Sequence, residues 1–327
     1  MLSLTKTSFQ FATRQLKSPI AQTRLTTNTR LAMKLNQRIF LACPTERNLS
    51  SRISTSFSSL AHNHLQSDTD SSNNFTLRKN PAIPQYLQQH YWWAYISPTM
   101  IRALDRQFLV DIVLWGNFSR LRDAAIQDLR AEEKSTSGVA SQIHGKNLQI
   151  SCVYANLTEK MVEQLAPLAS LDVIDVVPAQ LENLQRKLER NISTKSKQGQ
   201  VTLSCHNATH LSEFHDSSYD QILIFFLLHE TPDDVRRQVL AEAWRVLKPK
   251  GGKLVIIDYH QPRSSFWRSI MSGMYQLYEP FAYDLWTRSL SEWFPVNSRL
   301  AVQSKMHQTT FFGDLYQKVV ITKDENN

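Results

Sequence analysis

Side chains that can accept hydrogen bonds, transfer protons or bind a metal ion lie within or just after three hydrophobic runs of this 327-residue sequence. They are Asp175 within the run 171–177, His229 and Glu230 after the run 221–227, and Asp258 and His260 at the end of the run 253–258. Ligands of open α/β sheets bind beyond the carboxyl ends of the strands. If the three runs are neighbouring parallel strands, these residues are therefore candidates for one site.

Strand-like and helix-like stretches alternate from residue 148 onward, which predicts βαβ units and a mostly parallel, doubly wound α/β sheet. The predicted strands are 148–154, 171–177, 200–205, 221–227 and 253–258, with helices at 158–168, 178–190 and 233–247. A final pair of strands, at 300–307 and 315–322, could close the sheet.

Helical spacing of apolar residues within 86–129 predicts one or two amphipathic helices before the sheet. Nine aromatic residues within 266–294 predict a helical cap, which we place at about 262–296. We therefore expect a polar segment 1–67, a linker 68–80, an N-terminal helical region 81–142 and a sheet domain 143–323.

The excess positive charge lies in the first 67 residues, whose nine Lys and Arg against one Glu equal the net charge of +8 of the whole chain. The remaining charges balance, so nucleic acid is not an expected partner. The Ser, Thr and Arg content with spaced apolar residues is typical of a mitochondrial presequence. A disordered tail is the alternative.

Cysteine spacing and hydropathy argue against three further features. The three cysteines, Cys43, Cys152 and Cys205, lack CxxC spacing, so neither a disulfide framework nor a zinc site is predicted. No apolar run of about 18 residues occurs, which argues against a transmembrane helix.

Three segments resemble motifs of class I S-adenosylmethionine-dependent methyltransferases, and they occur in the same order. They are VIDVVPAQL (173–181), YDQILIFFLLHETPD (219–233) and RVLKPKGGKL (245–254). The resemblance implies a Rossmann-like fold and S-adenosylmethionine as co-substrate. It also implies that Asp175 accepts hydrogen bonds from the ribose hydroxyls, next to Val176, and that Asn207 and Ala208 lie beside the adenine.

The glycine-rich loop of those enzymes is altered in this chain. NLQISCVYANLT (147–158) stands where they have VLDIGCGTGNLT. Gln149 replaces an acid, and the three glycines that let the backbone approach the cofactor are replaced as well. The expected cofactor contacts of the loop are Gln149, Ser151, Cys152, Val153, Tyr154 and Ala155. A decayed enzyme that no longer binds cofactor is the alternative.

Longer segments are similar to RquA, the rhodoquinone-biosynthesis family, over roughly residues 80–295. They are QHYWWAYISP (89–98), DRQFLVDIVLWGNFSRLRDAA (105–125), CVYAN (152–156), FFLLHE (225–230) and VIIDYHQP (255–262). The resemblance implies conversion of ubiquinone to rhodoquinone, a quinone of anaerobic respiration. A ring methoxy group is exchanged for an amino group, with S-adenosylmethionine as nitrogen donor and manganese as helper. Ala155 departs from the glycine expected after the tyrosine.

The missing acid at Gln149 suggests a hypothesis about the nitrogen donor. A carboxylate stabilises a neighbouring ammonium and raises its pKa. A free α-amino group titrates near about 7.7–8.0, so replacing the carboxylate by an amide would favour the neutral, nucleophilic amine. On this hypothesis Gln149→Asp would impair amination while the cofactor still binds.

The same resemblance implies a manganese ion acting as a Lewis acid on a quinone carbonyl, with oxygen and imidazole ligands. The candidate ligands are Glu230, Asp258 and His260, and the candidate catalytic residues are His229, Glu230, His260 and Tyr154. Each of these side chains could instead be packed or hydrogen-bonded for structural reasons.

A ubiquinone substrate implies a peripheral position on the matrix side of the inner mitochondrial membrane. The aromatic cap and the aromatic cluster 91–95 could form the membrane-facing entrance, although ordinary core is the more frequent role of any single aromatic. Two other functions stay open: a conventional methyltransferase acting on a quinone precursor or other lipid, and a noncatalytic quinone-binding or assembly protein.

Overall fold

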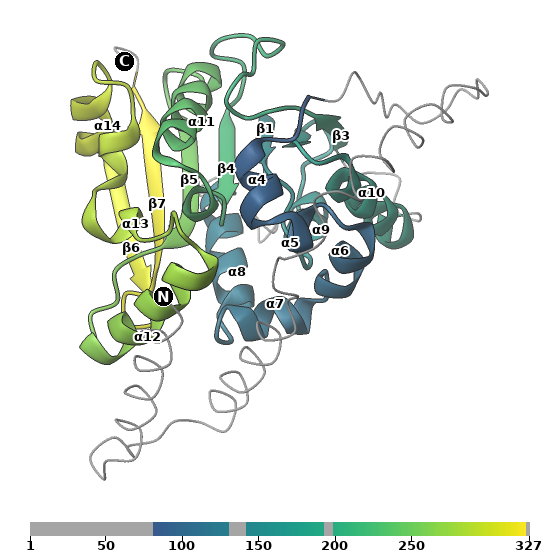
Figure 1. Cartoon of the computed structure of the whole chain (residues 1–327). Helices are drawn as coiled ribbons and strands as arrows, with labels where there is room; N and C mark the ends of the chain where they lie inside the picture. The colour runs from purple at the N-terminus through teal and green to yellow at the C-terminus, as the bar shows by residue number, and fades with distance from the viewer. Residues whose placement is uncertain (1–80, 131–141, 193–198, 325–327) are drawn as a thin grey trace.

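The computed structural model describes residues 81–130, 142–192 and 199–324 (Figure 1). The predicted presequence 1–67 and the linker 68–80 lie outside the described residues, as do residues 131–141 and 193–198.

Seven strands form one sheet in the order β3-β2-β1-β4-β5-β7-β6. Neighbours among β1 to β5 pair in parallel, and β7 runs antiparallel to both β5 and β6. The predicted doubly wound, mostly parallel α/β fold is thereby confirmed. The strands are β1 Lys146–Ile150, β2 Ser170–Asp175, β3 Gln200–Cys205, β4 Gln221–Phe225, β5 Gly252–Tyr259, β6 Met306–Phe311 and β7 Tyr316–Lys323.

The strand order reverses at β1. The chain passes from β1 outward through β2 to β3, and then crosses to β4 on the other side of β1. A ligand crevice is expected at such a point, beyond the carboxyl ends of β1 and β4. The candidate residues of the sequence follow strands on both sides of this reversal.

Alternate residues of the central strands are buried in two cores, one on each face of the sheet. Leu223 and Val255 belong to the core under α8 (Phe118–Leu129), α9 (Leu157–Val162) and α10 (Pro178–Ile192). Ile222 and Leu254 belong to the core under α11 (Asp233–Val246). Burial on both faces explains why these strands read as continuous apolar runs.

The described part of the N-terminal region, residues 81–130, forms five short helices rather than the one or two predicted. They are α4 Gln85–His90, α5 Trp92–Tyr95, α6 Pro98–Leu104, α7 Gln107–Val113 and α8. Pro98 opens α6, a position where its missing amide donor is not needed. Trp115 and Gly116, at φ 56° and 78°, end the helical path between α7 and α8. The helical spacing of apolar residues continues across these breaks, so the sequence pattern does not show where one helix ends and the next begins.

The strand predicted at 300–307 is wrong over most of its length. Residues Arg299–Lys305 form helix α14, and Met306 is the first residue of β6 to pair with β7. Val302 is fully buried while Leu300 is exposed. A helix that buries one apolar face therefore fits this segment better than a strand would.

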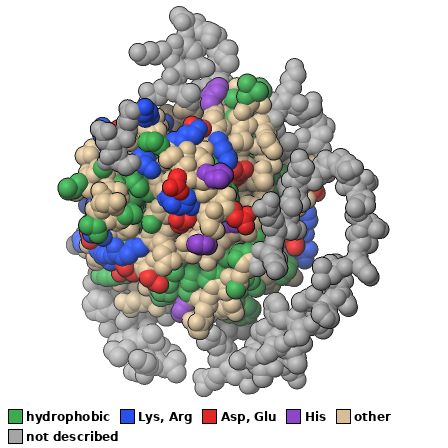
Figure 2. All heavy atoms as spheres, turned by 90° about the horizontal axis from the view of Figure 1, so that it is seen from above, with side chains coloured by type: hydrophobic (Ala, Val, Ile, Leu, Met, Phe, Trp, Pro, Cys, Tyr) green, Lys and Arg blue, Asp and Glu red, His purple; other side chains and the backbone are tan. Residues whose placement is uncertain are grey.

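The aromatic segment is mostly core. It folds as α12 Ser265–Tyr278, α13 Asp284–Thr287 and the 3₁₀ turn η3 Leu290–Trp293. Tyr275, Trp286 and Trp293 are buried, whereas Tyr283 is 50% exposed. No helix among the described residues is both long and apolar enough to cross a membrane. The face seen in Figure 2 mixes Lys and Arg with Asp and Glu rather than gathering one sign of charge.

Candidate active site

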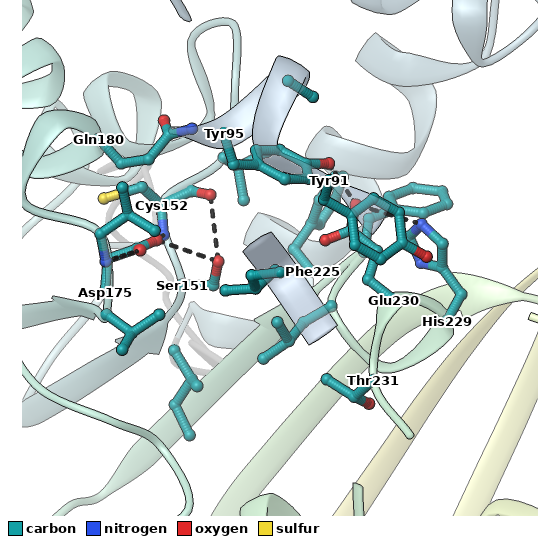
Figure 3. Close-up of a pocket in the computed structure, with 18 of the residues that line it drawn as sticks. Tyr91, Tyr95, Ser151, Cys152, Asp175, Gln180, Phe225, His229, Glu230 and Thr231 are labelled. Atoms are coloured by element: carbon teal, nitrogen blue, oxygen red, sulfur yellow. Dashed lines mark hydrogen bonds and ion pairs between the residues drawn. The ribbon is translucent and has the colours of Figure 1, made fainter. Parts of the chain in front are cut away.

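A largely apolar cavity lies beyond the carboxyl ends of β1, β2, β4 and β5, and helices α4 to α7 contribute its outer walls. Two polar groups line it (Figure 3). One contains Ser151, Cys152 and Asp175, and the other contains Glu230 and His229. Each strand thus delivers the residues that follow it to a single space, as the strand order requires.

The altered loop keeps a glycine-like backbone without glycine. Ser151 and Ala155 have φ of 76° and 63°, in the left-handed region that costs an ordinary residue roughly 1–2 kcal/mol. These are the first and third positions where the methyltransferase motif has glycine. The loop has therefore kept the conformation of the motif while losing its residue types.

Asp175 closes this loop against the end of β2. Its Oδ2 accepts hydrogen bonds from the amide of Cys152 at 2.7 Å and the hydroxyl of Ser151 at 3.2 Å, and its Oδ1 accepts one from the amide of Val177 at 2.8 Å. Burial raises the pKa of Asp175, and the hydrogen bonds oppose that shift. The carboxylate lines the cavity where sequence predicts the ribose.

Most of the other predicted cofactor contacts also line the cavity. They are Ser151, Cys152, Val153, Tyr154, Val176, Asn207 and Ala208. Asn207 uses its Oδ1 to accept hydrogen bonds from the amide and hydroxyl of Thr209, which fixes the turn after β3.

Two of the predicted contacts do not line this cavity. Gln149 is fully buried beneath the loop, where its Nε2 donates to the carbonyl of Ser151 at 3.0 Å and its Oε1 accepts from the hydroxyl of Thr158 at 2.9 Å. Ala155 faces a separate groove beside α6 and α10. The hypothesis from sequence requires Gln149 to contact a cofactor amine directly. Gln149 makes no such approach in this structure, because both ends of its side-chain amide are hydrogen-bonded inside the loop.

Tyr154 points toward the helices that cover the cavity. Its hydroxyl donates to the carbonyl of Ala94 and accepts from Nε2 of Gln180 at 3.0 Å. Its ring stacks on that of Tyr95, with 5.7 Å between the centroids. The altered loop and α5 therefore share one aromatic wall.

The second polar group contains three side chains with metal-binding character: His229, Glu230 and Glu279. One ligand atom from each lies within 4.8 Å of the others, and this is the only such group among the described residues. The hydroxyl of Tyr95 donates to Oε1 of Glu230, and that of Tyr91 donates to Oε2 of Glu279 at 2.8 Å. Two carboxylates thus face one imidazole at the edge of an apolar space.

The pKa values in this group reflect burial and close charges. Burial raises the pKa of Glu230 to about 8, although the neighbouring His229 opposes the shift. Burial also raises the pKa of Glu279, again against His229. Burial lowers the pKa of His229, but the charge and hydrogen bond of Asp258 outweigh it and raise the pKa to about 9.

Asp258 orients His229 instead of joining the group. Its Oδ1 accepts from Nδ1 of His229 at 2.9 Å, and its Oδ2 accepts from the amides of Leu228 and His229. Since Nδ1 is committed, Nε2 faces Oε1 of Glu230 at 3.6 Å. A carboxylate behind an imidazole in this way is common next to metals, where it fixes the ring.

His260 is not brought to the group, in contrast to the expectation from sequence. Its amide donates to the carbonyl of Leu315, and its Nδ1 pairs with the carbonyl of Asp314 at 2.9 Å, so it is tied to the turn before β7. His260 follows Asp258 by two residues, and the chain has already left the crevice there. Spacing along the strand could not show this.

Sequence reasoning missed Glu279, Tyr91 and Tyr95 as members of the group. Glu279 was hidden in the aromatic segment, where it is the only acid within 264–283. A lone acid among aromatic residues was the available signal. The sequence shows the two tyrosines only as part of an aromatic cluster, because their hydrogen bonds to acids far along the chain leave no trace in local spacing.

Comparison with known proteins finds similarity to methyltransferases over part of the chain. Residues 148–251 match the sequence model of a family described as methyltransferase domain. A demethylmenaquinone methyltransferase of Anoxybacillus flavithermus (strain DSM 21510 / WK1) is 29% identical over 148 residues, which are 45% of this chain. The chain spans 59% of the length of that relative.

Solved structures show low similarity. A putative S-adenosyl-L-methionine-dependent methyltransferase from Methanococcus maripaludis has 13% identity and a TM-score of 0.45, over 76% of this chain and 99% of that one. A SAM-dependent methyltransferase from Methanosarcina mazei has 18% identity and a TM-score of 0.40, over 56% and 94%. Similarity this low carries no argument about function. The match of residues 148–251 and the strand order agree on a domain with the Rossmann-like fold of class I S-adenosylmethionine-dependent methyltransferases.

Proposed function

We propose that this protein converts ubiquinone to rhodoquinone by replacing a ring methoxy group with an amino group, using S-adenosylmethionine as amino donor and a bound Mn²⁺ ion. The observation that carries the proposal is the group His229, Glu230 and Glu279, which shares one apolar cavity with Asp175. Simple methyl transfer does not call for such a buried cluster of metal ligands.

The Asp175 side of the cavity fits S-adenosylmethionine. A carboxylate at the end of the second strand is the usual partner of nucleoside ribose hydroxyls in doubly wound sheets. The loop that Asp175 holds has the left-handed residues Ser151 and Ala155, so its backbone runs as a glycine-rich loop would. This retained conformation argues against a decayed cofactor site.

The opposite side fits a divalent cation. Two carboxylates and one imidazole form the oxygen and nitrogen donor set that suits manganese. The buried carboxylate of Glu230 and the half-buried carboxylate of Glu279 lie close together, which is unfavourable without a cation and agrees with the raised pKa of both groups. When bound, the ion would supply Lewis-acid polarisation of a quinone carbonyl.

The protein side chains would position the ring and the proton donors. The stacked rings of Tyr95 and Tyr154 offer a flat apolar wall for a quinone. Burial raises the pKa of Tyr91 and Tyr95, so both hydroxyls remain protonated and orient the carboxylates. Leu109, with its neighbours on α7, lines the apolar part of the cavity, which suits an isoprenoid chain.

The proposed exchange begins with attack of the donor nitrogen on the ring carbon that bears the methoxy group. A carbon–nitrogen bond forms, the carbon–oxygen bond breaks, and the methoxide leaves as methanol after taking up a proton. The bond between this nitrogen and the α-carbon of S-adenosylmethionine then breaks in a redox-neutral step. The α-carbon gives a proton and an electron pair to the quinone ring, which becomes a quinol, and water hydrolyses the resulting imine, so that the nitrogen stays on the ring and the former cofactor leaves as an α-keto acid.

A conventional methyltransferase is the second candidate. The observation in its favour is the likeness to a demethylmenaquinone methyltransferase, a protein whose name states a quinone substrate. This candidate accounts for the family match, but it leaves the group around Glu279 without a role.

Expression in a ubiquinone-containing host, followed by mass spectrometry of the extracted quinones, separates these functions. A new aminoquinone supports the proposal, and a quinone with an added methyl group supports the methyltransferase. Unchanged quinones contradict both and favour a noncatalytic quinone-binding protein. A Glu279→Gln variant provides the matched control, since it should accumulate no aminoquinone.

We also propose that the protein acts on the matrix side of the inner mitochondrial membrane. The composition of residues 1–67 supports this location. Import into isolated mitochondria, with protection from added protease that depends on the membrane potential, would be expected for the full chain. A chain that stays protease-sensitive contradicts the location and leaves the chemistry untouched.

A further inference from the structure

Helix α7 is apolar but not buried. Five of its seven residues are apolar, yet none is buried, and Phe108 is 56% exposed. Leu109, Val110 and Val113 of the same helix line the cavity of the candidate site. The helix is therefore a thin wall, with the substrate cavity on one side and an unpartnered phenylalanine on the other.

Beside α7 lies a groove lined by four arginines, which we call the arginine groove. Arg102 and Arg106 come from α6 and the turn after it, and Arg186 and Arg190 come from α10. All four are exposed, and none forms an ion pair within the part of the chain that the structure describes.

The acids of this groove do not neutralise the arginines. Asp105 and Glu159 are both bonded to Lys187, at 3.0 and 3.3 Å. Glu189 accepts a hydrogen bond from Gln185. The groove thus contains five cations, the four arginines and Lys187, and three carboxylates, two of which form ion pairs with Lys187. The groove keeps an excess of unpaired positive charge next to Phe108.

We propose that α6, α7 and the arginine groove dock onto a bilayer that contains anionic phospholipids, and that a membrane-dissolved substrate enters the cavity past α7. An exposed apolar side chain flanked by arginines is the composition of a helix that lies in the headgroup region. The entry route rests on the proposed function, whereas the docking does not. The surface differs from the entrance expected from sequence, because only one of the nine aromatic residues of the cap, Tyr283, is exposed.

A lipid surface fits better than a protein or a nucleic acid. The arginines of α6, its following turn and α10 line a groove that reaches Gln107 at the start of the apolar helix α7, so apolar and charged contacts would be made together, as at a headgroup boundary. The face seen in Figure 2 carries both signs of charge, which gives no extended track for a phosphate backbone there.

A fluorophore at the docking surface reports insertion directly. In the full-length protein, Phe108→Cys is labelled with an environment-sensitive dye, and Leu300→Cys on α14, also strongly exposed, serves as matched control. The labelled unmodified chain gives the background from its own cysteines. Vesicles of phosphatidylcholine, with or without a minority of phosphatidylglycerol, are then titrated in.

Docking predicts that the label at position 108 brightens only with vesicles that contain phosphatidylglycerol, and that the label at position 300 does not respond. Adding Arg102→Gln and Arg106→Gln should raise the lipid concentration at half-response by about 30-fold, from about 1 kcal/mol per arginine. The control pair Arg263→Gln and Lys305→Gln, whose cations have carboxylate partners, should leave it unchanged.

Two results overturn the docking surface. One is vesicle binding without any response at position 108, which assigns attachment to another segment such as residues 1–80. The other is a bright label before lipid is added, which shows that the protein itself covers Phe108.

Turnover separates the docking from the proposed function. The Arg102 and Arg106 variants should keep turnover of a short-chain quinone in solution and lose it with a long-chain quinone in vesicles. Equal losses with both substrates contradict entry past α7. A wild-type protein that docks but aminates neither quinone contradicts the proposed function and leaves the docking intact.

Discussion

The carboxylate of Asp105 accepts a hydrogen bond from the amide of Ala155 at 2.6 Å, although the two residues are 50 positions apart. Asp105 ends helix α6, and Ala155 has the left-handed backbone of the altered loop. Lys187 holds the same carboxylate at 3.0 Å. The N-terminal helices thereby fix a loop conformation that glycine would adopt unaided.

The left-handed backbone of Ala155 predicts an unusual response to a glycine substitution. Ala155→Gly removes the strain of the left-handed conformation. Ala166→Gly, at an equally buried alanine without positive φ, only raises the conformational entropy of the unfolded chain. The free energy of unfolding should therefore fall by at least about 1 kcal/mol less for Ala155→Gly than for Ala166→Gly. Denaturant unfolding measures both. Equal losses would show that the strain at Ala155 is absent in solution.

Gln149 is predicted to act on stability rather than on the chemistry of an amine. Gln149→Glu would set a buried carboxylate oxygen against the carbonyl of Ser151 and cost on the order of 1–3 kcal/mol. Thermal unfolding tests this, with the exposed Gln276→Glu as control. A variant of normal stability whose turnover shifts along the pH axis would instead support direct contact between Gln149 and the donor amine.

Asp175 is predicted to control binding of S-adenosylmethionine. Asp175→Asn keeps the shape but loses the charge that strengthens its bonds to Cys152 and Val177, and any bond to the ribose. The dissociation constant in calorimetry should rise about tenfold or more, since hydrogen bonds to charged groups contribute roughly 1.5–3 kcal/mol. Asp172→Asn on the same strand, where the acid bonds Tyr219, should leave it unchanged. Equal affinities for the Asp175 variant and the wild type would remove the carboxylate from the cofactor site.

Metal affinity is predicted to depend on Glu279 and not on His260. Electron paramagnetic resonance of free Mn²⁺ measures binding without turnover. Glu279→Gln removes a proposed ligand and should abolish tight binding, while Asp258→Asn should weaken it about 10- to 100-fold by releasing His229. His260→Ala should bind normally. Loss of binding in the His260 variant alone would restore the site expected from sequence.

The sheet could be predicted from the sequence because each parallel strand is buried on both faces and reads as an apolar run. The residues at strand ends, such as Asp175 and His229, followed directly from that topology. Glu279 could not be placed, because α12 returns it to the crevice through packing that no local pattern encodes. The sequence of helix α14 does not indicate a helix, because a single buried residue, Val302, gives no helical period of apolar residues.

The loop was the feature most open to misreading. The residue types of the loop suggest that Gln149 favours a neutral cofactor amine. In the structure, the side chain of Gln149 instead forms hydrogen bonds with Ser151 and Thr158 that stabilise the turn. What distinguishes the site is instead the cluster of His229, Glu230 and Glu279 across the cavity.

The most direct test of the account follows the nitrogen. Purified protein is incubated with ubiquinone, Mn²⁺ and S-adenosylmethionine whose amino group is labelled with a heavy nitrogen isotope. The masses of the extracted quinones are then measured by mass spectrometry. We expect an aminoquinone that has lost one methoxy group and contains the heavy nitrogen, formed by the wild type and not by Glu279→Gln. A methylated quinone, or an aminoquinone without the label, would contradict it.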